Sequence, residues 1–596
     1  MRRGRLRMKQ ITLSLKGAVA LEKAIDTVKK EMNRGSYKTL LFHIYSGVED
    51  ESVIRAVTGR LSMSFPDCHF VGTLSAGEIV DKHIPEKGIA VSAMFFETTD
   101  IKVLRRVDVK GNEKVVGMKL AEEANAIPEL KALELLMPGT EFNTHILLDE
   151  LAAVSPDVII YGGYSGGHQL EKSEHYIFDE NGIDDNAIYA IAYYGKDFHV
   201  QVDKSAGWQR LGMPFKVTKA EDNRLIEINN APAVEVYEKY LQINRNDNFA
   251  EETFEFPLMA SMDGEELLRH TITVEDNGTL VLAGYVLEGM DIYLSYGNPE
   301  DIIRKVDHRL EEVEIFNPQA ILIFSCSVRK AFWENFAEIE IEPFAEIAET
   351  SGFYTWGEVK RNPDNGRLYE YNITMLTVAM REGDAEPLEN RYRVDDTVLK
   401  GQVSLLKRLS KLVAATTGEL QKAYLDLSLL NEKLEVMADY DALTGMYNRR
   451  KIEERIAYLL GEMKKNGTVL GTIMVDIDHF KEVNDTYGHG IGDEVLSILG
   501  KLCIKEVKKR GGNLGRWGGE EFFIVLPGYD EEKTYEFAEL LRKKVEETAF
   551  PCIDKLTISL GVHMAVENES RQEMYKKADD ALYISKQNGR NRTSVI

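Results

Sequence analysis

Two acidic residues end the apolar run MVDID (474–478), and their spacing suggests metal chemistry. Asp476 and Asp478 are two residues apart, so in a strand both carboxylates project from the same side, with the carbonyl of Ile477 beside them. Carboxylate and carbonyl oxygens are ligands that Mg²⁺ prefers, and Mn²⁺ accepts the same donors. The run therefore predicts part of a Mg²⁺ (or Mn²⁺) site, to which another segment must add an acidic residue.

The segment RWGGEEFFIVLP (516–527) can supply that residue. Gly518 and Gly519 permit a tight turn with positive φ between two strands, and Glu520 and Glu521 follow directly. Taken alone, an ordinary hairpin with solvated carboxylates is the better interpretation. Beside the acidic strand end, the hairpin instead predicts a site where a phosphate or nucleobase approaches the backbone closely.

Two further segments suggest a nucleotide site only when they are taken together with the acidic strand end and the hairpin. In KKADDALYISKQNGRNR (576–592), Lys586 and Arg590 are four residues apart and share one face if the helix extends that far. Cations so placed suit a triphosphate, although alone they would more often form a solvated helix face. DALTGMYNRR (441–450) alone predicts only a turn and the start of a helix.

Together these segments resemble the GGDEF family of diguanylate cyclases. The resemblance rests on four ordered motifs across roughly 155 residues: D-x-L-T-x-x-x-N-R-R, D-I-D-H-F-K-x-x-N-D-x-x-G-H-x-x-G-D, G-G-E-E-F and A-L-Y-x-x-K-x-x-G-R-N. It implies a fold similar to the palm of nucleotidyl cyclases and polymerases. It also implies that two GTP molecules, one on each of two facing domains, are joined into cyclic di-GMP with release of pyrophosphate.

The resemblance implies a role for each matching residue. The implied metal ligands are Asp476, the Ile477 carbonyl and Glu520, with Asp478 and Glu521 in the same acidic centre; Glu520, Glu521 and Asp478 are the expected catalytic group. The implied guanine readers are Asn484 and Asp493, and the implied phosphate contacts are Phe480, Lys481, His489, Lys586 and Arg590. A carboxylate at 493 accepts hydrogen bonds from guanine but is left unpaired by adenine, so GTP is expected in preference to ATP.

One departure concerns product inhibition. Many members of the family carry R-x-x-D beginning nine residues before the signature, and this chain has Lys509, Arg510, Gly511 and Gly512 there. We therefore expect no inhibition through the usual product site. A catalytically silent GTP-binding module is the alternative to the enzyme.

A strict heptad pattern precedes this last block. Ten of its twelve seam positions are apolar: Leu399, Gln402, Leu406, Leu409, Val413, Thr416, Leu420, Ala423, Leu427, Leu430, Leu434 and Met437. A spacing held at 3.5 residues favours a coiled coil over one long helix that packs on its own domains. A parallel coiled coil would pair two active sites, and we therefore expect a homodimer.

The first two-thirds of the chain alternates short strand-like runs with helix-like segments. The predicted strands include TLLFHIYS (39–46), GIAVSAMFF (88–96) and AILIFSCS (320–327), and Asn277-Gly278 predicts a hairpin turn. The segments VGTLSAGEI (71–79), YGGYSGG (161–167), FSCSVR (324–329) and SGFYTWGEV (351–359) resemble the FIST family, as does 214–241. The resemblance implies a sensor for an unknown small ligand. Candidate ligand contacts are Ser75, Gly77, Glu78, Ser165 and His168, with tight turn packing as the equal alternative. Cys326 is a candidate nucleophile if Arg329 lowers the pKa of its thiol, and Phe353, Tyr354 and Trp356 are a candidate aromatic cage. For both we favour burial in the core.

Composition and charge exclude several classes of protein. The chain has 596 residues and a formal charge of −25, of which the last block carries about −3, so binding to nucleic acid is not expected. Its four cysteines form no C-x-x-C pair, and no stretch predicts membrane insertion, so we expect a cytoplasmic protein. The predicted architecture is an α/β and α+β multidomain chain: two mixed α/β halves of the FIST region (36–230 and 231–382), a coiled-coil helix (397–438) and a palm-like GGDEF domain (439–596).

Overall fold

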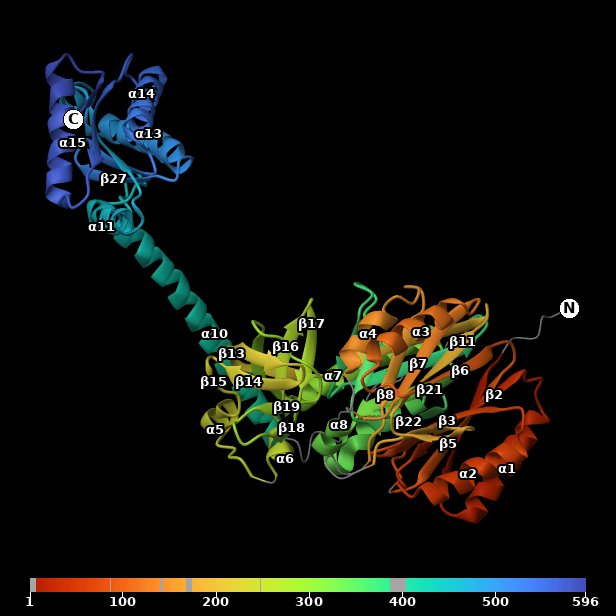
Figure 1. The fold of residues 1–596 in the computed structure, drawn as a ribbon. Helices are drawn as coiled ribbons and strands as arrows, with labels where there is room; N and C mark the ends of the chain where they lie inside the picture. Colours follow the sequence, from red (N-terminus) through yellow and green to blue (C-terminus); the bar gives the residue numbers. More distant parts are fainter. Residues whose placement is uncertain (1–6, 86, 140–142, 168–173, 247, 386–403) are drawn as a thin grey trace. The chain divides into compact units, whose positions relative to one another are not determined.

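The computed structural model of the chain describes residues 7–85, 87–139, 143–167, 174–246, 248–385 and 404–596 (Figure 1). The chain divides into two compact units, Met1–Gln421 and Lys422–Ile596. Within the described ranges, none of the helices combines the length and the apolar character needed to cross a membrane.

The first unit begins with a six-stranded sheet covered by helices α1 (Ala18–Met32) and α2 (Glu51–Ser64). Its strands, in spatial order, are β1 (Lys9–Leu15), β5 (Ile89–Phe96), β2 (Thr39–Ser46), β3 (His69–Leu74), β9 (Ile177–Asp179) and β10 (Gly182–Asp184). The runs predicted as strands at TLLFHIYS and GIAVSAMFF are β2 and β5, and nearly every residue in them is buried. Burial on both faces explains why they read as continuous apolar runs instead of alternating ones.

Two further sheets combine strands from both halves of the first unit. One has the order β24 (Leu368–Tyr371), β23 (Glu358–Arg361), β8 (Ile159–Tyr164), β7 (Leu130–Met137), β11 (Ala187–Tyr194), β6 (Asp100–Val107). The other has the order β12 (Phe198–Ser205), β25 (Met375–Glu382), β21 (Ala320–Cys326), β22 (Thr350–Thr355), β4 (Glu78–Val80). Strands from before residue 230 thus complete a sheet from after it, and the reverse also holds. The covering helices include α3 (Glu113–Asn125), α4 (Thr144–Leu151), α7 (Pro299–Phe316) and α8 (Ser327–Trp333).

The fourth sheet is antiparallel and lies wholly between residues 208 and 297. Its strands, in spatial order, are β17 (Glu265–Arg269), β16 (Leu258–Met262), β20 (Asp291–Gly297), β13 (Trp208–Glu221), β14 (Arg224–Ile228), β19 (Leu280–Leu282) and β18 (Thr271–Val274), with β15 (Ala231–Pro232) beside β14. The hairpin predicted at Asn277-Gly278 joins β18 to β19, and Gly278 has a φ of 87°. Two short helices, α5 (Glu235–Leu241) and α6 (Phe249–Thr253), accompany this sheet.

Helix α10 (Ser404–Asp439) has 36 residues and contains most of the predicted heptad seam. Positions 399 and 402, and the side chain of position 406, lie outside the described residues. The described leucines and methionine of the seam are about half exposed or more in the single chain: Leu409, Leu420, Leu427, Leu430, Leu434 and Met437. The coiled coil remains a prediction, which this exposure favours because an apolar seam needs a partner.

In the second unit, helices cover a five-stranded sheet. The strand order is β27 (Asn513–Gly518), β28 (Glu521–Pro527), β26 (Leu470–Ile477), β29 (Ile558–Ala565), β30 (Thr593–Val595). The helices are α11 (Arg449–Asn466), α12 (Phe480–Tyr487), α13 (His489–Lys508), α14 (Glu531–Glu547) and α15 (Arg571–Gln587). The central strand β26 is buried at all eight positions, so its end is held rigidly in the sheet.

Candidate active site

The acidic strand end and the acidic hairpin meet at one edge of this sheet. Asp476, on β26, is the direct antiparallel partner of Glu521, on β28, so their side chains lie on the same face. Asp476 is 6% exposed, whereas Glu520 and Glu521 are partly exposed. Two carboxylates and a third beside the turn therefore surround the end of a buried strand.

Charge is concentrated at this point. Burial raises the pKa of Asp476 to about 6, Lys586 opposes the rise, and the charges of Glu520 and Glu521 add to it. The Lys586 ammonium lies 2.9 Å from an Asp476 carboxylate oxygen. Burial likewise raises the pKa of Glu521. The edge thus holds more negative charge than a single lysine neutralises.

The hairpin turn is as predicted, with Gly519 at a φ of 51°. Arg516 holds it: its Nε and Nη2 donate to the Gly519 carbonyl at 3.0 and 2.8 Å, and its Nη1 lies 3.2 Å from both carboxylate oxygens of Asp441. Asp441 also accepts hydrogen bonds from the N–H and hydroxyl of Thr444. The motif DALTGMYNRR (441–450) therefore supports the turn that carries Glu520.

The same motif fastens the end of α10. The Asn448 amide and the Arg450 guanidinium donate to the Ala438 carbonyl at 2.6 and 2.9 Å, and Arg450 also pairs with Asp439. These contacts satisfy a carbonyl that the end of a helix leaves without a partner. A continuous set of contacts thus runs from α10 through Asp441 and Arg516 to the signature turn.

The predicted nucleotide contacts gather around the starts of α12 and α13. Phe480 and Lys481 begin α12; the Phe480 ring is buried, and the helix start leaves its first backbone N–H groups available to an anion. His489 begins α13, and its side chain and that of Asp493 are exposed. The Asn484 amide oxygen lies only 2.0 Å from where a Cβ on residue 492 would stand, so only glycine there lets Asn484 lie against the start of α13.

Asp478 lies just beyond the strand and is engaged with other partners. Its carboxylate accepts from the hydroxyls of Ser559 and Thr557 at 2.6 and 2.7 Å and from the backbone N–H of Asn591 at 3.0 Å. Its catalytic role stays a prediction, and these three bonds favour a supporting one. Lys586 and Arg590 do not share a helix face, because α15 ends at Gln587 and Arg590 lies beyond it at a φ of 59°.

The donor set fits a hard divalent cation. Asp476, the Ile477 carbonyl and Glu520 offer oxygen only, and burial, followed by the charges of Glu520 and Glu521, disfavours an Asp476 carboxylate that a bound cation would stabilise. Among the described residues, no group of three or more His, Cys, Asp and Glu side chains is placed to hold a metal. Two carboxylates and a carbonyl are too few for a closed site, but they suit Mg²⁺, which keeps waters and takes phosphate oxygens as further ligands.

Comparison with known families agrees with this geometry. Residues 438–592 match the family model described as diguanylate cyclase, GGDEF domain. Residues 40–231 match the FIST N domain and residues 233–361 the FIST C domain. The chain carries a GGDEF domain behind a FIST region.

Several diguanylate cyclases are similar to part of this chain. The chain is 38% identical over 165 residues to the diguanylate cyclase DgcM of Escherichia coli K12, covering 27% of this chain and 40% of DgcM. It is 33% identical over 209 residues to the diguanylate cyclase VdcA of Vibrio cholerae, covering 34% of this chain and 60% of VdcA. Among solved structures, an active GGEEF domain of a diguanylate cyclase from Vibrio cholerae is 35% identical, with a TM-score of 0.24 over 25% of this chain and 96% of that one.

The ligand contacts predicted in the FIST region are used internally. The Ser75 hydroxyl accepts from the Gly77 N–H, the Ser165 hydroxyl donates to the Tyr176 carbonyl, and Gly88 donates to the buried Glu78. His168 lies outside the described residues. These contacts favour tight turn packing, and a ligand role for these residues stays a prediction.

The remaining FIST candidates are in the core. Cys326 is fully buried, and burial raises the pKa of its thiol to about 12, so a thiolate nucleophile is disfavoured. Phe353, Tyr354 and Trp356 are also buried, so they pack in the interior and form no open cage.

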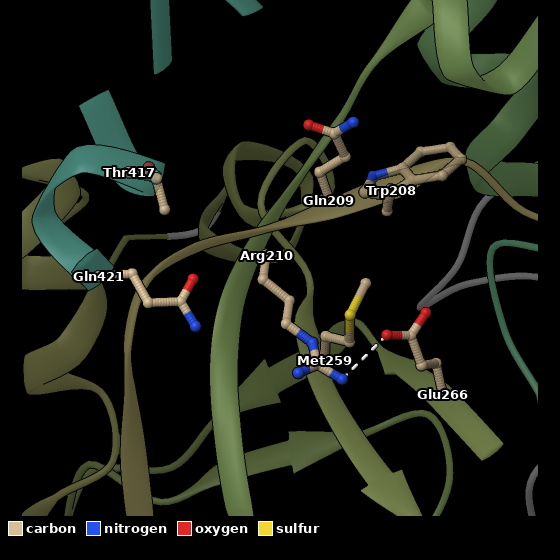
Figure 2. A pocket seen from close by; sticks show the side chains of 8 residues that line it. Trp208, Gln209, Arg210, Met259, Glu266, Thr417 and Gln421 are labelled. Carbon is tan, nitrogen blue, oxygen red and sulfur yellow. Dashed lines mark hydrogen bonds and ion pairs between the residues drawn. The ribbon is translucent and has the colours of Figure 1, made fainter. Parts of the chain in front are cut away.

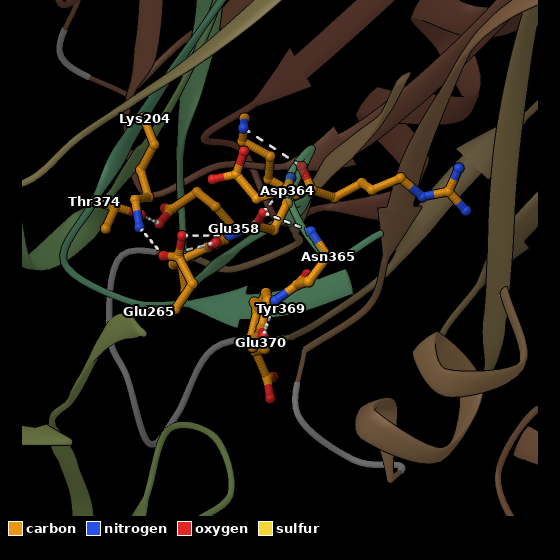
Figure 3. A network of polar contacts seen from close by, with 12 residues as sticks. Lys204, Glu265, Glu358, Asp364, Asn365, Tyr369, Glu370 and Thr374 are labelled. Carbon is orange, nitrogen blue, oxygen red and sulfur yellow. Dashed lines mark hydrogen bonds and ion pairs between the residues drawn. The ribbon is translucent and has the colours of Figure 1, made fainter. Parts of the chain in front are cut away.

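The first unit contains two other regions with polar side chains. A hollow of about 350 Å³ has Trp208, Met259 and the Arg210–Glu266 ion pair in its lining (Figure 2). A network beside β23 joins Lys204 to Glu265 at 2.5 Å (Figure 3). Neither brings together groups that would carry out a reaction.

Four residues that support the site have no separate signal in the sequence. The sequence places these residues within the quoted motifs but does not indicate their roles: Arg516, Asp441, Gly492 and Asn591. Their roles depend on contacts between segments far apart in the chain, such as the 75 residues that separate Asp441 from Arg516.

Proposed function

We propose that this chain is a diguanylate cyclase that condenses two GTP into cyclic di-GMP and two pyrophosphate. The observation that carries the proposal is the cluster at the end of β26, where Asp476 pairs with Lys586 beside Glu520 and Glu521. The match covers only 40% of DgcM, so the proposal for the whole chain rests on this cluster and on the intact motifs.

Asp476, the Ile477 carbonyl and Glu520 would hold Mg²⁺ (or Mn²⁺), which when bound offsets negative charge on the phosphoryl oxygens. Asn484 and Asp493 would select guanine through its N–H groups. The helix start at Phe480 and Lys481, with His489, Lys586 and Arg590, would orient the triphosphate. In each transfer the 3′-oxygen of one GTP forms a bond to the α-phosphorus of the other, the bond between the α-phosphorus and the bridging oxygen breaks, the hydroxyl proton is lost, and pyrophosphate leaves in line.

Each domain would hold a single GTP, so two chains must face each other. The exposed leucines of α10 support a homodimer through a coiled coil, which raises the effective concentration of one site near the other. We further propose that a small ligand at the FIST region regulates how often the two sites meet, which the position of α10 between the two regions supports. A thermal-shift screen of metabolites against the whole chain would identify that ligand.

The decisive experiment compares purified wild-type chain with Glu520→Gln, measuring pyrophosphate and cyclic di-GMP formed from GTP and Mg²⁺. Glu536→Gln, the same change on the exposed side of α14, is the matched control. We expect product from wild type and Glu536→Gln and a loss of at least about 100-fold in Glu520→Gln. GTP binding without pyrophosphate release in wild type would instead establish a silent GTP-binding module, and equal turnover by Glu520→Gln would reject the metal assignment.

A further inference from the structure

The segment after α15 has an uncommon backbone. Gly589, Arg590 and Asn591 have φ values of 103°, 59° and 46°, so two consecutive residues with side chains lie in the left-handed region. Asparagine tolerates this region, but arginine seldom adopts it, and such strain persists only where the surroundings impose the conformation. The residue held in this way, Arg590, is the one expected to reach the terminal phosphates.

Asn591 is fixed by contacts to two different elements. Its backbone N–H donates to Asp478 at 3.0 Å, its side-chain amide donates to Glu546 at 3.1 Å, and its side-chain oxygen accepts from Arg542 at 2.7 Å. Asp478 follows the strand that carries Asp476, whereas Arg542 and Glu546 belong to α14. Asn591 therefore connects residues 589–591 both to the end of β26 and to α14, a helix outside the predicted site.

The partners of Asn591 are themselves fixed. Glu546 lies 2.8 Å from Arg542 and 2.7 Å from Lys555, and these contacts, that of Lys555 first, lower its pKa to about 2. Asp478 accepts two hydroxyl hydrogen bonds besides the one from Asn591, and it is 5% exposed. Because every member is held by others, the network can impose a conformation that the Arg590 backbone would not choose.

We propose that Asn591, anchored by Asp478, Arg542 and Glu546, is a positioning residue that presents the Arg590 guanidinium to the terminal phosphates of the bound nucleotide. This inference rests on the proposed function for its ligand but not on turnover. Arg590 is exposed, and within the described residues no hydrogen bond or ion pair of its guanidinium is found, so its five donors remain available to an anion. The network acts on affinity for the β- and γ-phosphates and leaves recognition of guanine unchanged.

The test measures binding to the full chain by calorimetry, with Mg²⁺ and two ligands. One is the GTP analogue with a methylene between the α- and β-phosphorus atoms, which cannot react because the bond to be broken is replaced. The other is GMP, which lacks the phosphates that Arg590 would touch. Asn591→Gly removes the side-chain bonds while keeping positive φ accessible, and Asn591→Ala also adds backbone strain.

We expect both variants to weaken binding of the analogue by about tenfold or more and that of GMP by less than about twofold. In a chain that already carries Arg590→Ala, we expect Asn591→Gly to cause no further loss, because the two residues act as one unit. Unchanged binding of the analogue by Asn591→Gly would overturn the inference, as would equal losses for both ligands or additive losses with Arg590→Ala. If wild type bound the analogue no more tightly than GMP, the phosphate role of Arg590 would also be rejected, whether or not cyclic di-GMP is formed.

Discussion

Replacing Arg516 tests whether its contacts with the signature turn and with Asp441, in the motif at 441–450, support catalysis. Arg516→Ala removes two hydrogen bonds to the Gly519 carbonyl, at 3.0 and 2.8 Å, and the ion pair with Asp441. The Gly519 carbonyl belongs to the peptide that continues into Glu520, so its loss of support loosens a predicted metal ligand. Asp441 would also lose a cation that, with Thr444, lowers its pKa against the opposing effect of burial.

Hydrogen bonds to a charged group contribute about 1.5–3 kcal/mol each, and partial exposure of Arg516 places this case at the lower end. A loss of about 2 kcal/mol in the placement of the turn corresponds to about a 30-fold fall in turnover. The assay is the initial rate of pyrophosphate release at saturating GTP, with thermal unfolding measured in parallel. Arg516→Lys keeps the charge but cannot reproduce the planar fork, so we expect most of the loss to remain.

Arg455→Ala is the matched control. Arg455 is a partly buried arginine that donates to Asn513 at the start of β27, whereas the signature turn lies at the other end of that strand. We expect it to keep its turnover. A wild-type rate in Arg516→Ala would refute the supporting role, and so would an equal fall in Arg455→Ala.

Three further predictions concern other parts of the chain. Deleting residues 397–438 should lower the rate per chain at low protein concentration and restore it at high concentration; equal rates at every dilution would remove the role of the coiled coil. Arg361→Lys should destabilise the first unit by about 3 kcal/mol in urea unfolding, because the Arg361 guanidinium donates to five backbone carbonyls that one ammonium cannot satisfy; an unchanged midpoint would contradict this. Glu358 is fully buried beside Thr355 and Thr374, and burial raises its pKa from 4.5 to about 8 (Figure 3). The folded state then keeps a proton that the unfolded chain releases, so stability should fall by up to about 1.4 kcal/mol per pH unit between pH 5 and 8, and Glu358→Gln should flatten that slope; parallel slopes would contradict the assignment.

Local patterns in the sequence predicted many elements correctly. The apolar runs at 39–46 and 320–326 are buried strands, and the glycines at 278 and 519 occupy the turns expected of them. These features are set by neighbours in the chain, since burial on both faces needs an apolar run and positive φ favours glycine. The meeting of Asp476 with Glu520 and Glu521 was also predicted, because the end of a buried strand and a hairpin turn are each recognisable from a short stretch of sequence.

Contacts between distant segments could not be predicted. Period two placed Asp476 and Asp478 on one side of a strand, but β26 ends at Ile477, and Asp478 is engaged with Thr557 and Ser559 instead. Likewise the four-residue spacing of Lys586 and Arg590 suggested a shared helix face, and the glycine at 589 ends that pattern. The outcome for Asp478 depends on partners 79 and 81 residues away, which leave no periodic signal nearby, whereas α15 ends at Gln587 beside the local helix breaker Gly589.

The exchange of strands between the two FIST halves has a consequence for biosynthesis. β4 and β12 emerge from the ribosome early but pair with β22 and β25, which end at residues 355 and 382. β4 and β12 therefore lack these partner strands while well over a hundred further codons are translated, and during that time their edges are exposed to other nascent chains. The FIST region can therefore complete its sheets only after its last strand has been made, and a chain truncated before that strand keeps unpaired edges that proteases and chaperones recognise.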